Sequence, residues 1–168
     1  MIIEKTHKDL KDVLMEPKAL GIKDAYYIIA EADQNIIILS PGKNGVEFNK
    51  THGHFHKGQS VEIFTCVLGQ GVLVMQRNDE EGEAKEFKVV SLNPGKQVVI
   101  PAGFGHSLIN VGRTFLIVSH TGSNTPQANN YKAVKEKKGF AYYVVEKKGD
   151  IAFELNPNYR VRPQINTE

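Results

Sequence analysis

Three histidines stand at alternate positions in the segment KTHGHFHKGQSVEIF, residues 50–64, and a glutamate follows six residues after the last of them. These residues are His52, His54, His56 and Glu62. Successive side chains of a strand point to opposite faces, so the three imidazoles are expected to share one face. If the strand after the KGQS turn pairs with this one, Glu62 faces the same interior. Neutral imidazoles and a carboxylate are suitable ligands for Fe, Mn, Ni, Co or Zn, so the cluster predicts a metal site.

A single histidine on a strand is more often an ordinary core or surface residue than a ligand, and we interpret His7 and His120 in that way. The triplet is different, because buried imidazoles and a carboxylate are unfavourable unless they are paired or bound to a cation. We therefore interpret His54 and His56 as metal ligands. His52 is either a ligand or a residue beside the ligands.

A fourth candidate ligand lies in the segment NPGKQVVIPAGFGHSLIN, residues 93–110. Pro101 and Gly103 favour a turn between two short strands, and this turn presents His106 at the start of the second strand. The sequence therefore predicts His106 as a further ligand, although the same turn could serve folding alone.

The elements that must position these residues are predicted to be strands. Short runs rich in Ile, Val, Phe and Tyr are broken by Gly, Pro, Asn and Asp every eight to twelve residues. Strands are expected at residues 26–31, 36–39, 46–51, 61–68, 72–76, 86–91, 97–100, 106–110, 114–120, 140–146 and 151–155. Eleven short strands indicate an all-β fold, an antiparallel sandwich or barrel.

Two short helices and one domain complete the expected organisation. Thr6 is a candidate N-cap with Asp9 three residues later, and Pro17 ends the helical pattern that follows. A second helix is expected at about residues 130–138, with Gly139 as its C′ residue. We expect a single domain over residues 1–168 with its core at about 26–155. The polar C-terminal segment NPNYRVRPQINTE is expected to be a loose or partner-clasping tail.

Composition excludes several classes of function. The formal net charge is +2, with 21 basic and 19 acidic residues, too weak a field to predict nucleic-acid binding. No apolar run approaches the roughly 20 residues that a membrane span needs, and MIIEKTHKDL is not a signal run. The single cysteine, Cys66, cannot form an internal disulfide and is expected to be a core side chain. We therefore expect a cytoplasmic protein.

Both histidine segments resemble the paired motifs of the cupin superfamily. His54, His56, Glu62 and Gly69 fit the first motif, and the second is matched at every position from Gly95 to Asn110. The surrounding SPGKNGVEFNKTHGHFH resembles the signature of the cupin-type, archaeal-like phosphoglucose isomerases. Further matches are GQGVLVMQ, NYKAVKEKKGF and VVEKKGDIAFELNPNYR, so the resemblance spans about residues 36–160. It implies a cupin fold, a small antiparallel β-barrel or jelly roll with a few short helices.

The resemblance also implies a site and a reaction. The reaction would be the interconversion of glucose 6-phosphate and fructose 6-phosphate through an enediol, a step of glycolysis and gluconeogenesis. Glu62 would be the catalytic base, a metal ligand or both. One divalent ion is implied, Fe2+ first, with Mn2+, Ni2+, Co2+ or Zn2+ as alternatives, and a homodimer is the expected assembly. The implied metal ligands are His54, His56, Glu62 and His106, and the implied residues for the sugar phosphate are Thr51, Gly53 and Tyr131.

The chain departs from the family pattern at several places. The gap from His56 to Glu62 is one residue shorter, and Phe64 stands where a tyrosine is expected. The strand NIIIL lacks the family's threonine, and Asn130 replaces an acidic neighbour of Tyr131. Two alternatives therefore stay open. One is an iron-dependent cupin oxygenase, and the other is a non-catalytic sugar-binding or sensory cupin, which the loss of the tyrosine favours.

Overall fold

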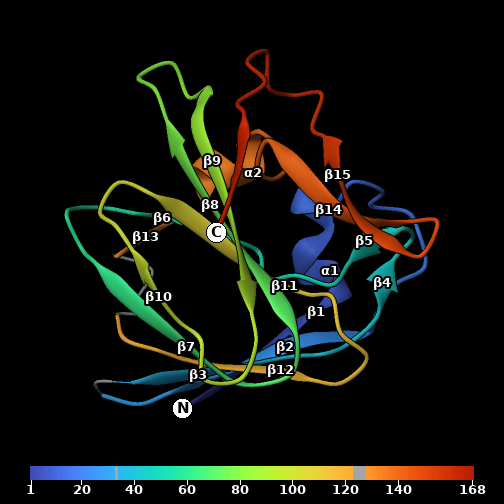
Figure 1. Ribbon diagram of the computed structural model, residues 1–168, viewed down its shortest axis with the longest axis vertical. Helices are drawn as coiled ribbons and strands as arrows, with labels where there is room; N and C mark the ends of the chain where they lie inside the picture. Colours follow the sequence, from blue (N-terminus) through green and yellow to red (C-terminus); the bar gives the residue numbers. More distant parts are fainter. Residues whose placement is uncertain (33, 123–127) are drawn as a thin grey trace.

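The computed structural model describes residues 1–32, 34–122 and 128–168, and strands dominate it (Figure 1). Its helical segments are short: α1 (His7–Leu10), the 3-10 turn η1 (Lys11–Val13) and α2 (Lys132–Glu136). The strands are β1 (Ile2–Thr6), β2 (Asp24–Ala30), β3 (Asn35–Leu39), β4 (Lys43–Asn44), β5 (Glu47–Phe48), β6 (Phe55–His56), β7 (Glu62–Leu68), β8 (Gly71–Asn78), β9 (Ala84–Leu92), β10 (Gln97–Ile100), β11 (Gly105–Asn110), β12 (Leu116–His120), β13 (Asn129–Asn130), β14 (Tyr142–Lys147), β15 (Asp150–Leu155) and β16 (Ile165–Thr167).

The strands form one large sheet and three smaller ones. The large sheet has the order β1-β2-β3-β12-β7-β10 and runs across the lower part of Figure 1. Sheets β11-β8-β9-β16 and β15-β14-β5-β4 lie above it, and β13 pairs with β6 at the side. All pairs among the described strands are antiparallel except β16 with β9. The predicted all-β fold is therefore confirmed, with its described strands in separate facing sheets, as in a jelly roll, and not in one closed cylinder.

Most predicted strands are present within one or two residues of their expected ends, and residues 97–100 match without any shift. The prediction of one strand over residues 46–51 is wrong, because the only strand there is the two-residue β5, and Lys50 forms just an isolated bridge with Ile109. The histidine segment is not a continuous strand either, since Gly53 has a φ of +79°. Its expected partner is also wrong: β6 pairs with β13, whereas β7 pairs with β10 and β12. A residue in the left-handed conformation interrupts the alternation of side chains along a strand. The alternation predicted for residues 52–56 therefore does not continue across Gly53.

The first helix begins as the sequence predicts. The backbone N–H of Thr6 donates to Oδ2 of Asp9 at 2.7 Å, and Oγ1 of Thr6 lies 2.8 Å from the same oxygen.

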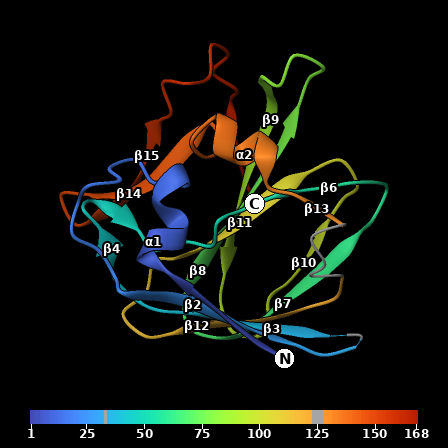
Figure 2. The same ribbon diagram turned by 180° about the vertical axis from the view of Figure 1, so that it is seen from behind.

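The C′ residue of the second helix is Lys138 and not the predicted Gly139. Lys138 takes the left-handed conformation at C′, with φ +56°, and Gly139 follows it. The N–H groups of Lys138 and Gly139 then close the Schellman pattern of hydrogen bonds to Lys135 and Val134. The helix packs next to η1 (Figure 2).

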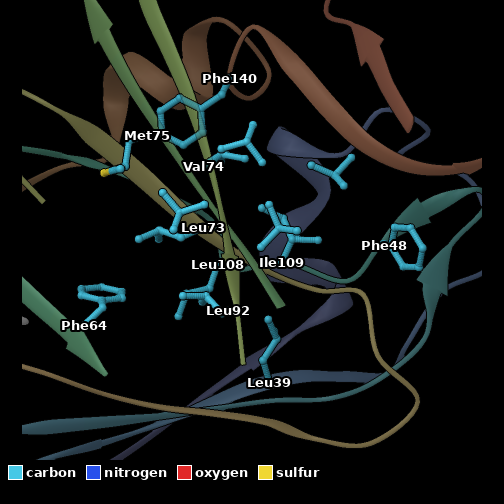
Figure 3. Close-up of a cluster of buried hydrophobic side chains, with 14 of the residues drawn as sticks. Leu39, Phe48, Phe64, Leu73, Val74, Met75, Leu92, Leu108, Ile109 and Phe140 are labelled. Atoms are coloured by element: carbon cyan, nitrogen blue, oxygen red, sulfur yellow. The ribbon is translucent and has the colours of Figure 1, made fainter. Parts of the chain in front are cut away.

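The apolar core lies between the facing sheets. Figure 3 shows Leu39, Phe64, Leu73 and Leu108 among the side chains that fill this space. Strand alternation directs them inward, and each is at most 1% exposed. The cluster also contains Leu10, Val13 and Tyr159, so it extends at both ends beyond the predicted core of residues 26–155.

The C-terminal segment is not the loose tail that its composition suggested. The Tyr159 hydroxyl group donates to the carbonyl of Gly139 at 2.9 Å, and β16 pairs with β9. Glu83 also holds this segment in place. Its carboxylate accepts a hydrogen bond from the backbone N–H of Arg160 at 2.8 Å and one from the Lys137 ammonium group at 2.7 Å. These partners, the lysine first, lower the pKa of Glu83 to about 2.

We expect Glu83→Gln to destabilise the protein at neutral pH. The folded-state pKa of Glu83 is about 2 and lies below the ordinary value of 4.5, so the charged form contributes stability above about pH 4.5. This contribution is lost as the pH falls through about 2. The difference in free energy of unfolding between wild type and Glu83→Gln should therefore be constant above about pH 5 and shrink in acid. Urea unfolding across this range checks it, with exposed Glu81→Gln as the matched control; a difference that does not change with pH would contradict it.

One face of the large sheet carries apolar side chains outward. Ile63 and Val99 are opposite one another on β7 and β10, and they are 37% and 53% exposed. Val67 is 54% exposed on β7, and Tyr27 pairs with Ile38 on β2 and β3.

No helix among the described residues is long and apolar enough to cross a membrane.

Candidate metal centre and pocket

Three separate segments bring the candidate ligands together. His54 and His106 form a bridge between the histidine segment and β11, in which the N–H of His106 donates to the carbonyl of His54 at 3.0 Å. His56 follows on β6, and Glu62 is the first residue of β7. The pairing of β6 with β13 and the bridge to β11 thus replace the hairpin that the sequence suggested.

The donor atoms of these four residues lie within 4.8 Å of one another. Nε2 of His56 and Nε2 of His106 are each 3.3 Å from Oε2 of Glu62. Nε2 of His54, Nε2 of His56 and Oε2 of Glu62 are buried and have no hydrogen-bond partner among the described residues. Buried polar atoms are rarely left unpaired, and a divalent cation would satisfy all three. The four side chains could therefore hold a metal ion.

Burial keeps the imidazoles of His54 and His106 in the neutral form that binds metal. Burial, and next the neighbouring His56, lower the pKa of His54 to about 3. Burial and then His54 hold the pKa of His106 well below its ordinary value. A ligating imidazole must be neutral, so these rings need not lose a proton at neutral pH before binding a cation.

The backbone at Gly122 restricts how Glu62 can lie. Gly122 has a φ of +115°, and a Cβ there would stand 2.1 Å from Oε1 of Glu62. The carboxylate is therefore held with Oε1 against this glycine and Oε2 toward the imidazoles. The role of Gly122 could not be predicted from the sequence, because 60 positions separate it from Glu62 and nothing local links the two.

A pocket opens on the histidines and has one apolar wall. Ile28, Ile37, Phe64 and Leu108 contribute aliphatic and aromatic surface, and neither lysine nor arginine is among the described lining residues. The full lining is Tyr26, Ile28, Ile37, Thr51, Gly53, His54, Phe64, His106, Leu108, His120 and Tyr131. The pocket therefore contains all three residues predicted to contact the sugar phosphate.

The hydroxyl group of Thr51 is already engaged. Ser107 donates its only hydroxyl proton to the carbonyl of Thr51 at 2.8 Å, so Thr51 is the donor in the 3.2 Å contact between the two hydroxyl groups. Oγ1 of Thr51 also accepts the N–H of Leu108 at 3.0 Å. The glycine at Gly53 has a packing reason, because a Cβ there would lie 2.6 Å from the ring of Phe140. The roles of Thr51 and Gly53 in binding phosphate stay predictions.

Tyr131 and His52 lie side by side at the edge of the pocket. The Tyr131 ring is 39% exposed, and its centroid lies 5.1 Å from that of His54 and 5.4 Å from that of His52. Nδ1 of His52 is 2.9 Å from the carbonyl oxygen of Gly53, and His52 is outside the four-residue donor set. Gly53 turns the chain between His52 and His54, which is why the shared face predicted for the triplet is wrong.

Two further residues of the pocket were missed or set aside. The sequence alone favours an ordinary histidine at position 120, yet His120 is 4% exposed and lines the pocket. A signal existed in the strand LIVSH, where alternation places His120 on the buried side with Leu116 and Val118. Tyr26 had no such signal, because it stands in the apolar and aromatic run AYYIIA, as an ordinary core residue does.

Comparison with known proteins agrees with the motifs. Residues 4–161 match the family Glucose-6-phosphate isomerase (GPI). The glucose-6-phosphate isomerase of Pyrococcus furiosus is 32% identical over 134 residues, which cover 77% of this chain and 67% of that protein. The enzyme of the same name from Thermococcus litoralis is 33% identical over 78% of this chain and 67% of its own length. The chain therefore belongs to the glucose-6-phosphate isomerase family and is an isomerase of the cupin fold.

Proposed function

We propose that the protein is a metal-dependent aldose-ketose isomerase that interconverts glucose 6-phosphate and fructose 6-phosphate. The observation that carries this proposal is the cluster of buried, unpartnered donor atoms from His54, His56 and Glu62, together with His106, beside the pocket of a glucose-6-phosphate isomerase family member. A cytoplasmic location and a single domain stay predictions.

The reaction needs a base beside the carbonyl carbon. Glu62 takes the proton from the carbon next to the carbonyl group and returns it one carbon away, through an enediol. A divalent ion held by the three imidazoles and Oε2 of Glu62 would stabilise the negative charge that develops on the sugar oxygens. Fe2+ is the first candidate, with Mn2+, Ni2+, Co2+ and Zn2+ as alternatives. Thr51, Gly53 and Tyr131, which line the pocket, bind the sugar phosphate.

A direct assay tests this function. The purified protein is analysed for bound metals, and conversion of fructose 6-phosphate to glucose 6-phosphate is followed before and after chelation. Turnover should disappear with the metal and return on addition of one of the five divalent ions. Turnover that persists in fully metal-free protein would overturn the metal-dependent mechanism.

The apolar wall of the pocket favours a second candidate, a metal-binding cupin that binds a sugar without turning it over. Phe64 and Ile37 offer no hydroxyl group, and the hydroxyl group of Thr51 is engaged. This candidate predicts a normal metal content and measurable sugar binding without turnover. The same assay, combined with calorimetry, therefore separates the two functions.

The apolar outer face of the large sheet supports a homodimer. Exposed Ile63, Val67 and Val99 would be covered by a second copy of the chain. We expect Val99→Lys to shift the protein from dimer to monomer in sedimentation equilibrium, because a buried lysine without a partner is unfavourable. Lys96→Glu, also in the β7–β10 region but within a turn, is the control. A wild-type monomer at micromolar concentration would contradict the proposed dimer.

A further inference from the structure

A fifth histidine faces the pocket without belonging to the four clustered donors. His120 is the last residue of β12, and its Cα pairs with that of Phe64 on β7. The two rings are tilted by 32°, with 4.8 Å between their centroids. His120 lines the same pocket as His54 and His106, but it is not part of the donor set that could hold a metal.

The hydrogen bond of the ring decides which nitrogen carries the proton. Nδ1 of His120 lies 2.9 Å from the carbonyl oxygen of Thr121, and a carbonyl oxygen only accepts, so Nδ1 is the donor. Nε2 of the neutral ring therefore presents a lone pair. This nitrogen is buried and has no hydrogen-bond partner among the described residues. Since buried acceptors are seldom left unpaired, the arrangement points to a ligand that donates a hydrogen bond to Nε2. Burial also lowers the pKa of His120, which favours the neutral ring.

The isomerisation needs a second proton transfer besides the one assigned to Glu62. An aldose has its carbonyl on the first carbon and a hydroxyl group on the second, and the ketose has the reverse. One proton must therefore move between the two carbons, and a second must move between the two oxygens. While Glu62 holds the carbon-bound proton it cannot also accept the hydroxyl proton, so a second group is needed to carry the proton between the two oxygens.

We propose that Nε2 of His120 binds the hydroxyl group on the second carbon of the sugar and carries its proton to the oxygen on the first carbon. The inference rests on the proposed function. As the second carbon becomes a carbonyl, its O–H bond breaks and the proton passes to Nε2. Nε2 then gives this proton to the first oxygen, so the ring ends in the state in which it began. In the same reaction Glu62 moves the carbon-bound proton, and no other reactant is needed.

Three variants distinguish a hydrogen bond from the sugar to Nε2 of His120 from a role of His120 in packing alone. His120→Asn keeps an N–H group for the carbonyl of Thr121 and removes Nε2. His120→Gln offers an amide oxygen within reach of the Nε2 position, but an amide does not carry a proton. His7→Asn is the matched control, because His7 is also hydrogen-bonded through Nδ1, at 2.8 Å from Oδ1 of Asn44, and lies outside the pocket.

The measurements are metal content, kcat and KM for fructose 6-phosphate, and Kd for glucitol 6-phosphate, which carries hydroxyl groups but has no carbonyl and cannot react. We expect His120→Asn to keep its metal, to lower kcat by about 100-fold and to weaken binding of glucitol 6-phosphate by about 5-fold. His120→Gln should recover the binding but not kcat, and His7→Asn should behave as wild type.

Each outcome decides the inference. Unchanged kcat and Kd in His120→Asn would overturn it, and so would full recovery of kcat in His120→Gln. If wild type has no turnover, the proposed function fails, and the Kd values still test the hydroxyl contact. Weaker binding in His120→Asn then supports this contact, whereas equal binding, or no binding to wild type, overturns it.

Discussion

Replacement of His56 by alanine is expected to remove the bound divalent ion and to lower turnover by about 1,000-fold or more. Nε2 of His56 is buried, lies 3.3 Å from Oε2 of Glu62 and has no hydrogen-bond partner among the described residues. Its loss leaves three donors, so both the affinity for the ion and the stabilisation of charge on the substrate fall, and the latter supplies several kcal/mol. Metal analysis after gel filtration and the fructose 6-phosphate assay measure the two effects.

The matched control is His52→Ala, which removes the same kind of side chain four positions earlier in the same segment. His52 is outside the donor set, so this variant should keep its full metal content. Melting temperature adds a second reading, because an ion that binds only the folded state stabilises wild type and His52→Ala but not His56→Ala. Equal metal content in wild type and His56→Ala would contradict the proposed centre.

Replacement of Lys50 by methionine is expected to lower the free energy of unfolding by about 3–5 kcal/mol. The Lys50 ammonium pairs with the carboxylate of Glu47, and the two side chains are only 10% and 1% exposed. Lys50 also donates to the carbonyl of Val13 at 2.5 Å, and Glu47 accepts the N–H of Met15 at 2.8 Å. The single substitution would leave the charge of Glu47 buried without its partner, which is the reason for the large loss.

Urea unfolding of a small set of variants checks this prediction. Glu47→Gln combined with Lys50→Met should recover most of the lost stability, because the amide still accepts the N–H of Met15 and no charge is left unpaired. Lys132→Met is the control for an exposed pair, since Lys132 and Glu136 are 82% and 63% exposed and should contribute less than about 1 kcal/mol. A loss of less than about 1 kcal/mol in Lys50→Met would show that the buried pair does not stabilise this region.

The sequence predicts a strand or a helix end correctly where residues close together in the chain determine it. The alternation of apolar residues predicted β7, β10 and β12, because side-chain direction in a strand depends only on the parity of the residue number. Thr6 and Asp9 predicted the start of α1, since a capping box joins residues three apart. The short strands β4, β6 and β13 could not be predicted, because two residues carry too little pattern, and β6 and β13 pair with one another across a long stretch of chain.

The sequence by itself determined the fold class, the family and the four donors that the structure brings within 4.8 Å of one another. Residue types at fixed spacing in two motifs are enough for that. Only the tertiary structure decided that Gly53 separates His52 from the cluster, that Lys50 turns inward to Glu47, and that His120 joins the pocket. These three outcomes depend on backbone conformation and on side chains remote in the sequence. Contacts of this kind appear only when the sheets pack against one another.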